Sequence, residues 1–320
     1  MKPPKVSVLV PVYNGEPFLV ECLDSILAQD FADMEILIAD DGSTDGSVAL
    51  VQRYAAREPR IRWWKNERNL GLAANFNCCL RAARGEYIKY VLQDDKLLKP
   101  DTVRRMVQKM EGDAAVVLVA TASQSIDASS KLLDHRTMFT RAGVWGGWNV
   151  ISKCFEIRGN PIGEPTVVMF RRQQGARGFN VNFHYLIDLE MWLYLLRQGN
   201  LAYIPEQLCA FRKHSEQESV ACMQAGALKT EYPKLLNLYA GDSGLIAACS
   251  RQAIFANIYY LRKWCPHESS HLLTRLRKEL GGGWYALYYF KHKVTRPFKK
   301  LKTVFRRFAV QCGCLSAGEQ

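Results

Sequence analysis

Short apolar runs alternate with segments of helical periodicity through the first third of the chain. The runs lie at residues 6–10, 35–39, 61–64 and 86–92, and the helical patterns at 19–27, 47–57, 73–83 and 103–110. Strands that alternate with helices of this length form a mostly parallel sheet with helices on both faces. The pattern therefore predicts a Rossmann-like α/β fold, in which ligands bind beyond the carboxyl ends of the strands.

The rest of the chain is less regular. Further strands are predicted at 115–122, 167–170 and 201–204, and a helix at 189–196, whereas residues 123–160 show a mixed pattern. From about residue 224 onward only helical patterns occur. We therefore expect a first domain over residues 1–222 and a helical C-terminal extension over residues 223–320.

Three of the four early strands end in polar clusters, at residues 11–16, 40–43 and 93–95. The topology of a parallel sheet would bring these clusters to one rim. The last cluster contains adjacent carboxylates, Asp94 and Asp95, which repel each other and are not needed for packing. They suit a hard divalent cation that keeps open positions for phosphate. An exposed turn or a helix N-cap is the alternative interpretation.

The composition is that of a globular protein, with 48% hydrophobic and 23% charged residues. The 10 cysteines form no C-x-x-C pair, so we interpret most of them as buried thiols. No uninterrupted apolar stretch approaches the ~20 residues that a membrane span needs, which favours a cytoplasmic location. Most of the net charge of +12 lies between residues 291 and 307, where no acid occurs.

Four segments occur in the order and spacing of a known family. They are residues 6–15, residues 39–47, residues 69–71 with 85–88, and residues 93–95. Together they resemble the signatures of the family 2 glycosyltransferases, which have the A-type nucleotide-sugar transferase fold. The resemblance covers roughly residues 5 to 220. It implies inverting transfer of a sugar from a nucleoside-diphosphate sugar to a hydroxyl acceptor, with Mn²⁺ or Mg²⁺ as the metal, and makes the first domain the catalytic one.

The resemblance also implies a set of donor-binding residues. Pro11, Tyr13 and Asn14 would flank the base, with Tyr13 stacking on it. Asp41 would accept a hydrogen bond from a ring N–H, which favours a UDP, dTDP or GDP donor. Gly71 belongs to the same donor set. Taken alone, Tyr13 could be a packing aromatic, and residues 40–43 a turn with a helix cap.

The metal site implied by the family uses the paired carboxylates and a late histidine. Asp94 would lie near the ribose and the metal, and Asp95 would coordinate the metal that bridges the two phosphates. His214 would close over the donor and reach the metal. It lies in a pattern that matches the end of the family's catalytic domain at Arg212, His214, Gln217 and Ser219. A lone surface histidine is the plainer interpretation of His214.

Two departures from the family pattern bear on the donor site. Gln93 stands where many relatives carry Asp, and residues 75–77 replace an Arg-Asn pair late in the third predicted helix. The arginine that would steady the pyrophosphate is therefore missing from its usual place. Arg171 or Arg172 is the substitute that the sequence offers.

Inverting transfer needs a carboxylate that takes the proton of the acceptor hydroxyl. The family base lies about one helical turn before an aromatic residue, which is the position of Asp188 before Trp192. Glu190 is the competitor, but on a helix the two lie about 200° apart, so only one can face the sugar. The helix N-terminus should keep Asp188 ionised and lower its basicity. Without the resemblance, Asp188 reads as a helix-capping acid.

Two more segments resemble pocket-forming parts of the family, residues 177–180 and residues 160–165, and a buried-turn role is equally consistent with both. The C-terminal tail carries Phe298, Leu301, Phe305 and Phe308 on one helical face and basic residues elsewhere. Such a helix suits an anionic membrane surface, here the inner leaflet where a lipid-linked acceptor would wait. A helix packed on the core with a solvated basic face is the alternative.

The expected partners are therefore a nucleotide sugar, a lipid-linked or cell-surface glycan acceptor and an anionic membrane surface, with no nucleic acid. A processive membrane synthase would need membrane spans and a Q-x-x-R-W motif, which the sequence lacks. A nucleotidyltransferase would need basic residues in its first loop, and residues 11–16 contain none. A non-catalytic membrane- or nucleic-acid-binding protein would explain the tail, but gives no reason for the three polar strand ends.

Overall fold

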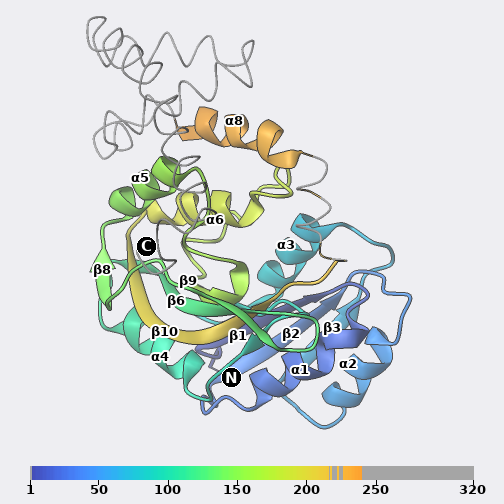
Figure 1. Cartoon of the computed structure of the whole chain (residues 1–320). Coiled ribbons are helices and arrows are strands. Elements are labelled where there is room, and N and C mark those ends of the chain that lie inside the picture. Colours follow the sequence, from blue (N-terminus) through green and yellow to red (C-terminus); the bar gives the residue numbers. More distant parts are fainter. Residues whose placement is uncertain (1, 216, 218–221, 223–225, 240–320) are drawn as a thin grey trace, which may run out of the picture. The chain divides into compact units, whose positions relative to one another are not determined.

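The computed structural model describes residues 2–215, 217, 222 and 226–239 (Figure 1). The chain divides into two compact units, residues 1–235 and 236–320, and the sheet and the candidate site lie in the first. The predicted boundary between residues 222 and 223 stays a prediction. The basic tail and Ser219 lie outside the described residues. Within the described part of the chain, no helix is long and apolar enough to cross a membrane.

One mixed sheet forms the centre of the first unit, with the strand order β3-β2-β1-β4-β9-β6-β10-β5. The strands are β1 (Val6–Val12), β2 (Met34–Asp40), β3 (Ile61–Lys65), β4 (Tyr87–Tyr90), β5 (Lys96–Leu97), β6 (Val116–Ile126), β7 (Leu132–Arg136), β8 (Gly143–Trp145), β9 (Val168–Arg171) and β10 (Asn200–Arg212). Strands β3, β2, β1 and β4 are parallel, β9 runs antiparallel to both β4 and β6, and β10 is parallel to β6. The predicted α/β class is confirmed.

Helices cover both faces of this sheet, as the alternating pattern predicts. They are α1 (Glu16–Leu27), α2 (Ser47–Ala55), α3 (Leu72–Ala82), α4 (Thr102–Glu111), α5 (Gly147–Ile157), α6 (Ile187–Leu196) and α8 (Ala227–Tyr239). Helices α1, α2 and α4 lie on one face, and α3, α5 and α6 lie on the other (Figure 1). The short 3-10 turn Pro165–Val167 leads into β9.

Burial explains why the first strands and helices are readable from sequence. Every residue of β1 and β2 is buried, which gives an apolar run instead of an alternation. Helix α4 buries Val103, Met106, Val107 and Met110 on one side, at the helical spacing that predicts it. Strands β2, β1 and β4 are neighbours in the sheet and parallel, so their carboxyl ends lie at one rim.

The region between residues 123 and 160 differs most from the expectation. It contains β7, β8 and α5, none of which the mixed pattern predicts. Strand β7 pairs with β6 at its edge, and its residues are exposed or half-buried, so no buried face marks it in the sequence. Strand β10 is also longer than predicted, because it continues through register shifts opposite β6 as far as Arg212.

Candidate active site

The three polar strand ends meet at the carboxyl rim of β1, β2 and β4, as predicted. Asn14 joins the first two loops: its backbone N–H donates to Ser43 Oγ at 2.9 Å, and its Oδ1 accepts from the backbone N–H of Thr44 at 2.9 Å. The Gly15 N–H donates to Ser47 Oγ at 2.9 Å. Asn14 has a φ of 49°, a left-handed conformation that asparagine tolerates better than most residues.

The unusual Gln93 connects the third loop to the first. Its Oε1 accepts from the Tyr13 N–H at 2.7 Å, and its Nε2 donates to the Tyr13 carbonyl at 2.9 Å. The side chain of Tyr13 is left 46% exposed, so a ring face is open for stacking on a base. A carboxylate at position 93 could accept from the N–H but could not donate to the carbonyl.

Asp41 lies at the rim but is engaged with the protein. Its Oδ1 accepts from Asn66 Nδ2 at 2.8 Å and from the Leu70 N–H at 2.9 Å, and its Oδ2 accepts from the Gly71 N–H at 3.0 Å. Each carboxylate oxygen has two lone pairs, so Oδ2 retains capacity for a base N–H. Pro11 is a buried part of β1 opposite Ala39, so its place is beneath the rim.

Asp94 lies beside His214, and the donor and metal roles of both residues stay predictions. Its Oδ2 lies 3.1 Å from His214 Nε2 and 3.4 Å from Gln217 Nε2. The side chains of Asp94 and His214 are each 16% exposed, so both remain accessible at the rim. The ring of Phe18 packs 4.8 Å from the His214 ring, between centroids, and helps to orient it.

Asp95 lies behind this pair and is fully buried. Its Oδ1 accepts from the Arg212 N–H at 2.9 Å, and its Oδ2 accepts from the Thr166 hydroxyl. Burial, followed by the neighbouring charge of Asp94, holds the pKa of Asp95 well above its usual range. The metal role of Asp95 stays a prediction, and this arrangement favours Asp94 as the carboxylate that faces a ligand.

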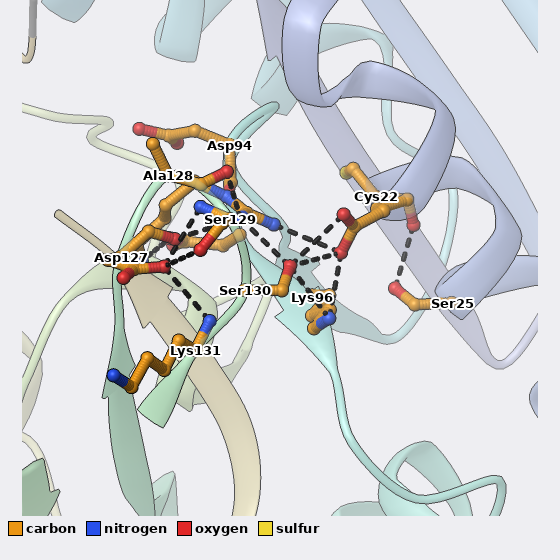
Figure 2. A network of polar contacts seen from close by, with 12 residues as sticks. Cys22, Ser25, Asp94, Lys96, Asp127, Ala128, Ser129, Ser130 and Lys131 are labelled. Carbon is orange, nitrogen blue, oxygen red and sulfur yellow. Dashed lines mark hydrogen bonds and ion pairs between the residues drawn. The ribbon is translucent and has the colours of Figure 1, made fainter. Parts of the chain in front are cut away.

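Arg212 holds the motif in place from behind. Its guanidinium donates to the Asp94 carbonyl at 2.7 Å, to Ser130 Oγ at 2.9 Å and to the carbonyls of Asp127 and Ala128, and it pairs with Glu21 at 3.1 Å. Figure 2 shows the Asp127–Ser130 turn beside Asp94 and next to Lys96. This fully buried side chain therefore joins β10, the β6–β7 turn and α1 to the Asp94-Asp95 segment.

The residues at the rim fit part of a divalent-cation site. Among the described residues no group of three His, Cys, Asp or Glu side chains converges on one point. The Asp94 carboxylate and the His214 imidazole, 3.1 Å apart, supply an oxygen and a nitrogen donor that suit Mn²⁺. A site with two protein ligands leaves positions for phosphate oxygens, which is how Mg²⁺-type sites bind nucleotides.

Asp188 lies in the first turn of α6 and is mostly buried. Its Oδ2 accepts from Asn160 Nδ2 at 2.8 Å, and its Oδ1 accepts from the Leu189 N–H at 2.6 Å. Burial, and after it the charge of Glu164, raises the pKa of Asp188 to about 7. The prediction that its position at the helix N-terminus lowers its basicity is wrong, because desolvation outweighs the hydrogen bonds from Leu189 and Asn160 that favour the charged form.

The competing carboxylate, Glu190, is engaged elsewhere. Its two oxygens accept from the Arg177 guanidinium at 2.8 and 2.7 Å, and Glu190 is 1% exposed. Arg177 also lies 3.8 Å above the ring centroid of Tyr194. A buried bidentate ion pair of this kind holds the 177–180 loop on α6, which leaves Asp188 as the carboxylate available for chemistry.

The arginines proposed for the pyrophosphate lie at the wrong end of the sheet. Arg171 pairs with Tyr87, at the start of β4, and donates to the carbonyls of Val116 and Met110. Arg172 donates to the Gly85 carbonyl at 2.7 Å. Because Asp94 follows the opposite end of β4, the prediction that either arginine reaches the diphosphate is wrong.

Sequence reasoning missed a carboxylate that supports the Asp188 helix. Glu231 of α8 accepts from the N–H groups of His184, Tyr185 and Leu186, at 2.8 to 3.3 Å, and is 4% exposed. These are backbone donors at and before the N-terminus of α6, which a helix cannot satisfy internally. No local pattern could have found this contact, since Glu231 comes from a distant helix.

Known proteins share this sequence pattern and fold. The family model described as Glycosyl transferase family 2 matches residues 7–173. The chondroitin synthase of Escherichia coli is 28% identical over 226 residues, which cover 68% of this chain and 30% of that enzyme.

Two solved structures share the fold at low identity. TarS of S. aureus, in complex with UDP-GlcNAc, has a TM-score of 0.64 at 15% identity, covering 88% of this chain and 78% of that chain. The mannosyltransferase PcManGT from Pyrobaculum calidifontis, in complex with GDP-Man and Mn²⁺, has a TM-score of 0.50 at 20% identity, covering 92% and 89%. With the family match over more than half of its length, the chain belongs to glycosyl transferase family 2 and is a glycosyltransferase enzyme.

Proposed function

We propose that this enzyme moves a sugar, with inversion, from a nucleoside-diphosphate sugar to a hydroxyl acceptor, and that Asp188 is its general base. The observation that carries the proposal is the convergence of the three polar strand ends at one rim, with the Asp94–His214 pair at its accessible end. The solved relatives named above bind UDP-GlcNAc and GDP-Man, which supports a nucleotide-sugar donor.

The donor nucleotide lies on the rim in this proposal. Tyr13 stacks on the base, and the free capacity of Asp41 Oδ2 accepts from a ring N–H, which selects a UDP, dTDP or GDP donor. Asn14 and Gly71 shape the two loops that border the base, and the buried Pro11 supports them from β1. Asp94 lies nearest the ribose and the diphosphate.

A divalent cation, Mn²⁺ or Mg²⁺, would be held by Asp94 and His214, with Asp95 behind them. When bound, it would offset the negative charge that develops on the departing diphosphate. The Mn²⁺ of the Pyrobaculum mannosyltransferase supports this proposal. Arg212 keeps the Asp94 backbone in position for this role through its 2.7 Å hydrogen bond to the Asp94 carbonyl.

Asp188 accepts the proton of the acceptor hydroxyl in the displacement. A base works best when its pKa lies near the operating pH, and burial raises the pKa of Asp188 to about 7. Asn160 holds Oδ2 with a 2.8 Å hydrogen bond and so fixes the direction of the carboxylate. The acceptor that we propose is a lipid-linked or cell-surface glycan precursor, met at the inner membrane face. The likeness to a chondroitin synthase supports a glycan acceptor.

Thermal unfolding with UDP, dTDP, GDP and ADP, each with and without Mn²⁺, tests the donor site. A ligand at 100 times its Kd adds about 2.7 kcal/mol to the free energy of unfolding. We expect a Mn²⁺-dependent rise in Tm with one of the first three nucleotides, lost in Asp94→Asn and kept in the control Asp101→Asn, at the residue that precedes α4. If none of these nucleotides raises Tm, the rim is not a donor site, and salt-dependent binding of RNA or vesicles by the tail becomes the function to test.

A further inference from the structure

A cavity of about 310 Å³ lies beside the Asp188 site, between β6, β7 and the 161–163 segment. Its lining includes Thr121, Ser123, Arg136, Met138, Ile162 and Tyr203. The volume is at the lower end of the ~300–1,000 Å³ range of small-molecule pockets. None of the roles proposed above uses this cavity.

Small hydroxyl groups line the inner part of the cavity. Thr121 and Ser123, both on β6, are 3% and 4% exposed. The Tyr203 hydroxyl accepts from the Met138 N–H at 2.9 Å, so its own proton remains to be donated. Met138 and Ile162 supply apolar surface in the same cavity. Hydroxyl donors and acceptors next to apolar surface match a sugar ring or a polyol chain, which carries both.

The charges favour a neutral ligand over a phosphate. Arg136 forms an ion pair with Glu164, so the guanidinium in the lining is already compensated.

The wall of the cavity is shared with the base. Asn160 Nδ2 donates to the Gly163 carbonyl at 2.9 Å and to Asp188 Oδ2 at 2.8 Å. The same carbonyl accepts from Trp192 Nε1 at 2.9 Å, on the helix that carries Asp188. One short segment therefore separates the cavity from the carboxylate, and a chain of linked units could occupy both places.

We propose that this cavity is an acceptor subsite for a neutral sugar or polyol unit, adjacent to the unit that Asp188 deprotonates. The proposal rests on the proposed function, since it takes Asp188 as the base. The specific contacts are hydroxyl hydrogen bonds to Thr121, Ser123 and Tyr203. An acceptor that offers only one unit would leave this cavity unfilled and bind more weakly.

Saturation-transfer NMR on the full chain tests the subsite without a known acceptor. The probes are methyl β-glucoside, N-acetylglucosamine and ribitol, with inorganic phosphate as an anionic competitor. We expect signals from at least one neutral probe that phosphate does not displace. In Ser123→Leu, whose side chain fills the cavity, the signals should disappear. In Tyr203→Phe, which keeps the ring and loses the hydroxyl, the Kd should rise about fivefold.

The control is Gln52→Leu, at an exposed position on α2, which should bind the probes like the wild type. The subsite proposal is overturned if no neutral probe binds, if Ser123→Leu and Tyr203→Phe bind as well as the wild type, or if phosphate displaces the probe. Nucleotide stabilisation with Mn²⁺ is measured on the same proteins. If nucleotide does not stabilise the wild type, the result counts against the donor site. If nucleotide stabilises the wild type but no neutral probe binds, the result counts against the subsite alone.

Discussion

At the scale of single residues, the site depends on side chains that hold backbone and carboxylates in place. Gln93 binds both polar backbone groups of Tyr13, Asn160 holds Asp188, and Arg212 holds Asp94. The family resemblance indicated the candidate ligand-binding residues, but these supporting contacts join positions distant in sequence. Gln93 stood out as a departure from the pattern, and its role as a two-way bridge became clear only from the geometry.

Asp188 should give the enzyme an activity that rises with pH. Its pKa of about 7 means that the carboxylate is protonated, and so unable to act as base, below that pH. We expect kcat/KM for transfer to increase through about pH 7 and then level off, and Asp188→Asn to lower kcat by about 10²–10⁴. A flat profile between pH 5 and 9 in the wild type would contradict this role.

The same raised pKa affects folding. Because the folded protein binds this proton more tightly than the unfolded chain does, the contribution of Asp188 to the free energy of unfolding falls as pH rises from about 4 to 7. Urea unfolding at pH 5 and pH 8 measures the difference. The free energy of unfolding should fall less between these two pH values in Asp188→Asn than in the wild type, because the variant lacks the Asp188 carboxyl group.

Gln93→Leu should weaken nucleotide binding while leaving the fold intact. It removes the two hydrogen bonds that orient Tyr13, each worth about 0.5–1.5 kcal/mol, so we expect the Kd for the stabilising nucleotide to rise about tenfold. Isothermal titration calorimetry gives this Kd directly. The control is Gln52→Leu, an exposed position on α2. Equal affinities in Gln93→Leu and Gln52→Leu would show that the bridge does not matter for binding.

At the scale of elements, the helix that carries Asp188 is held from two sides. The Arg177–Glu190 ion pair ties it to the preceding loop, and Glu231 of α8 accepts the backbone N–H groups just before it. The sequence predicted α6 itself from its apolar spacing. It could not predict α8 as a support, because the contact depends on where a later helix packs.

Glu231→Ala should loosen the start of α6. It leaves three backbone N–H groups without their acceptor, and loss of such a cap costs about 0.5–2 kcal/mol in the free energy of unfolding. We expect kcat to fall because Asp188 loses its fixed direction, while nucleotide stabilisation stays unchanged. Urea unfolding and the transfer assay measure the two effects.

Thr230→Ala, at the exposed position next to Glu231 on α8, is the control. Among the hydrogen bonds of the described residues, the Thr230 hydroxyl makes one, to the Ala227 carbonyl of the same helix. If Glu231→Ala matches this control in both stability and kcat, α8 does not support the helix that carries Asp188.

At the scale of the whole molecule, the sequence was most informative where burial is continuous. Strands β1, β2 and β4 and helices α1 to α4 follow from apolar runs and helical spacing, and the rim follows from their parallel order. Strand β7 is exposed and β8 is very short, so neither leaves a periodic signal. The cavity beside Asp188 is lined on one side by residues 161–163, within the segment that resembles a pocket-forming part of the family, and on another by β7. Because β7 leaves no periodic signal, the cavity as a whole was not predicted.

The central claim is that Asp188 is the base of a metal-assisted transfer from a nucleotide sugar. Release of nucleoside diphosphate from UDP-, dTDP- and GDP-sugars with Mn²⁺, with water as the acceptor, tests it most directly in the wild type and in Asp188→Asn. We predict release from one donor class by the wild type, and at least about a hundredfold loss in Asp188→Asn with unchanged nucleotide binding. Equal rates in the two proteins, or no release from any donor, would contradict the account.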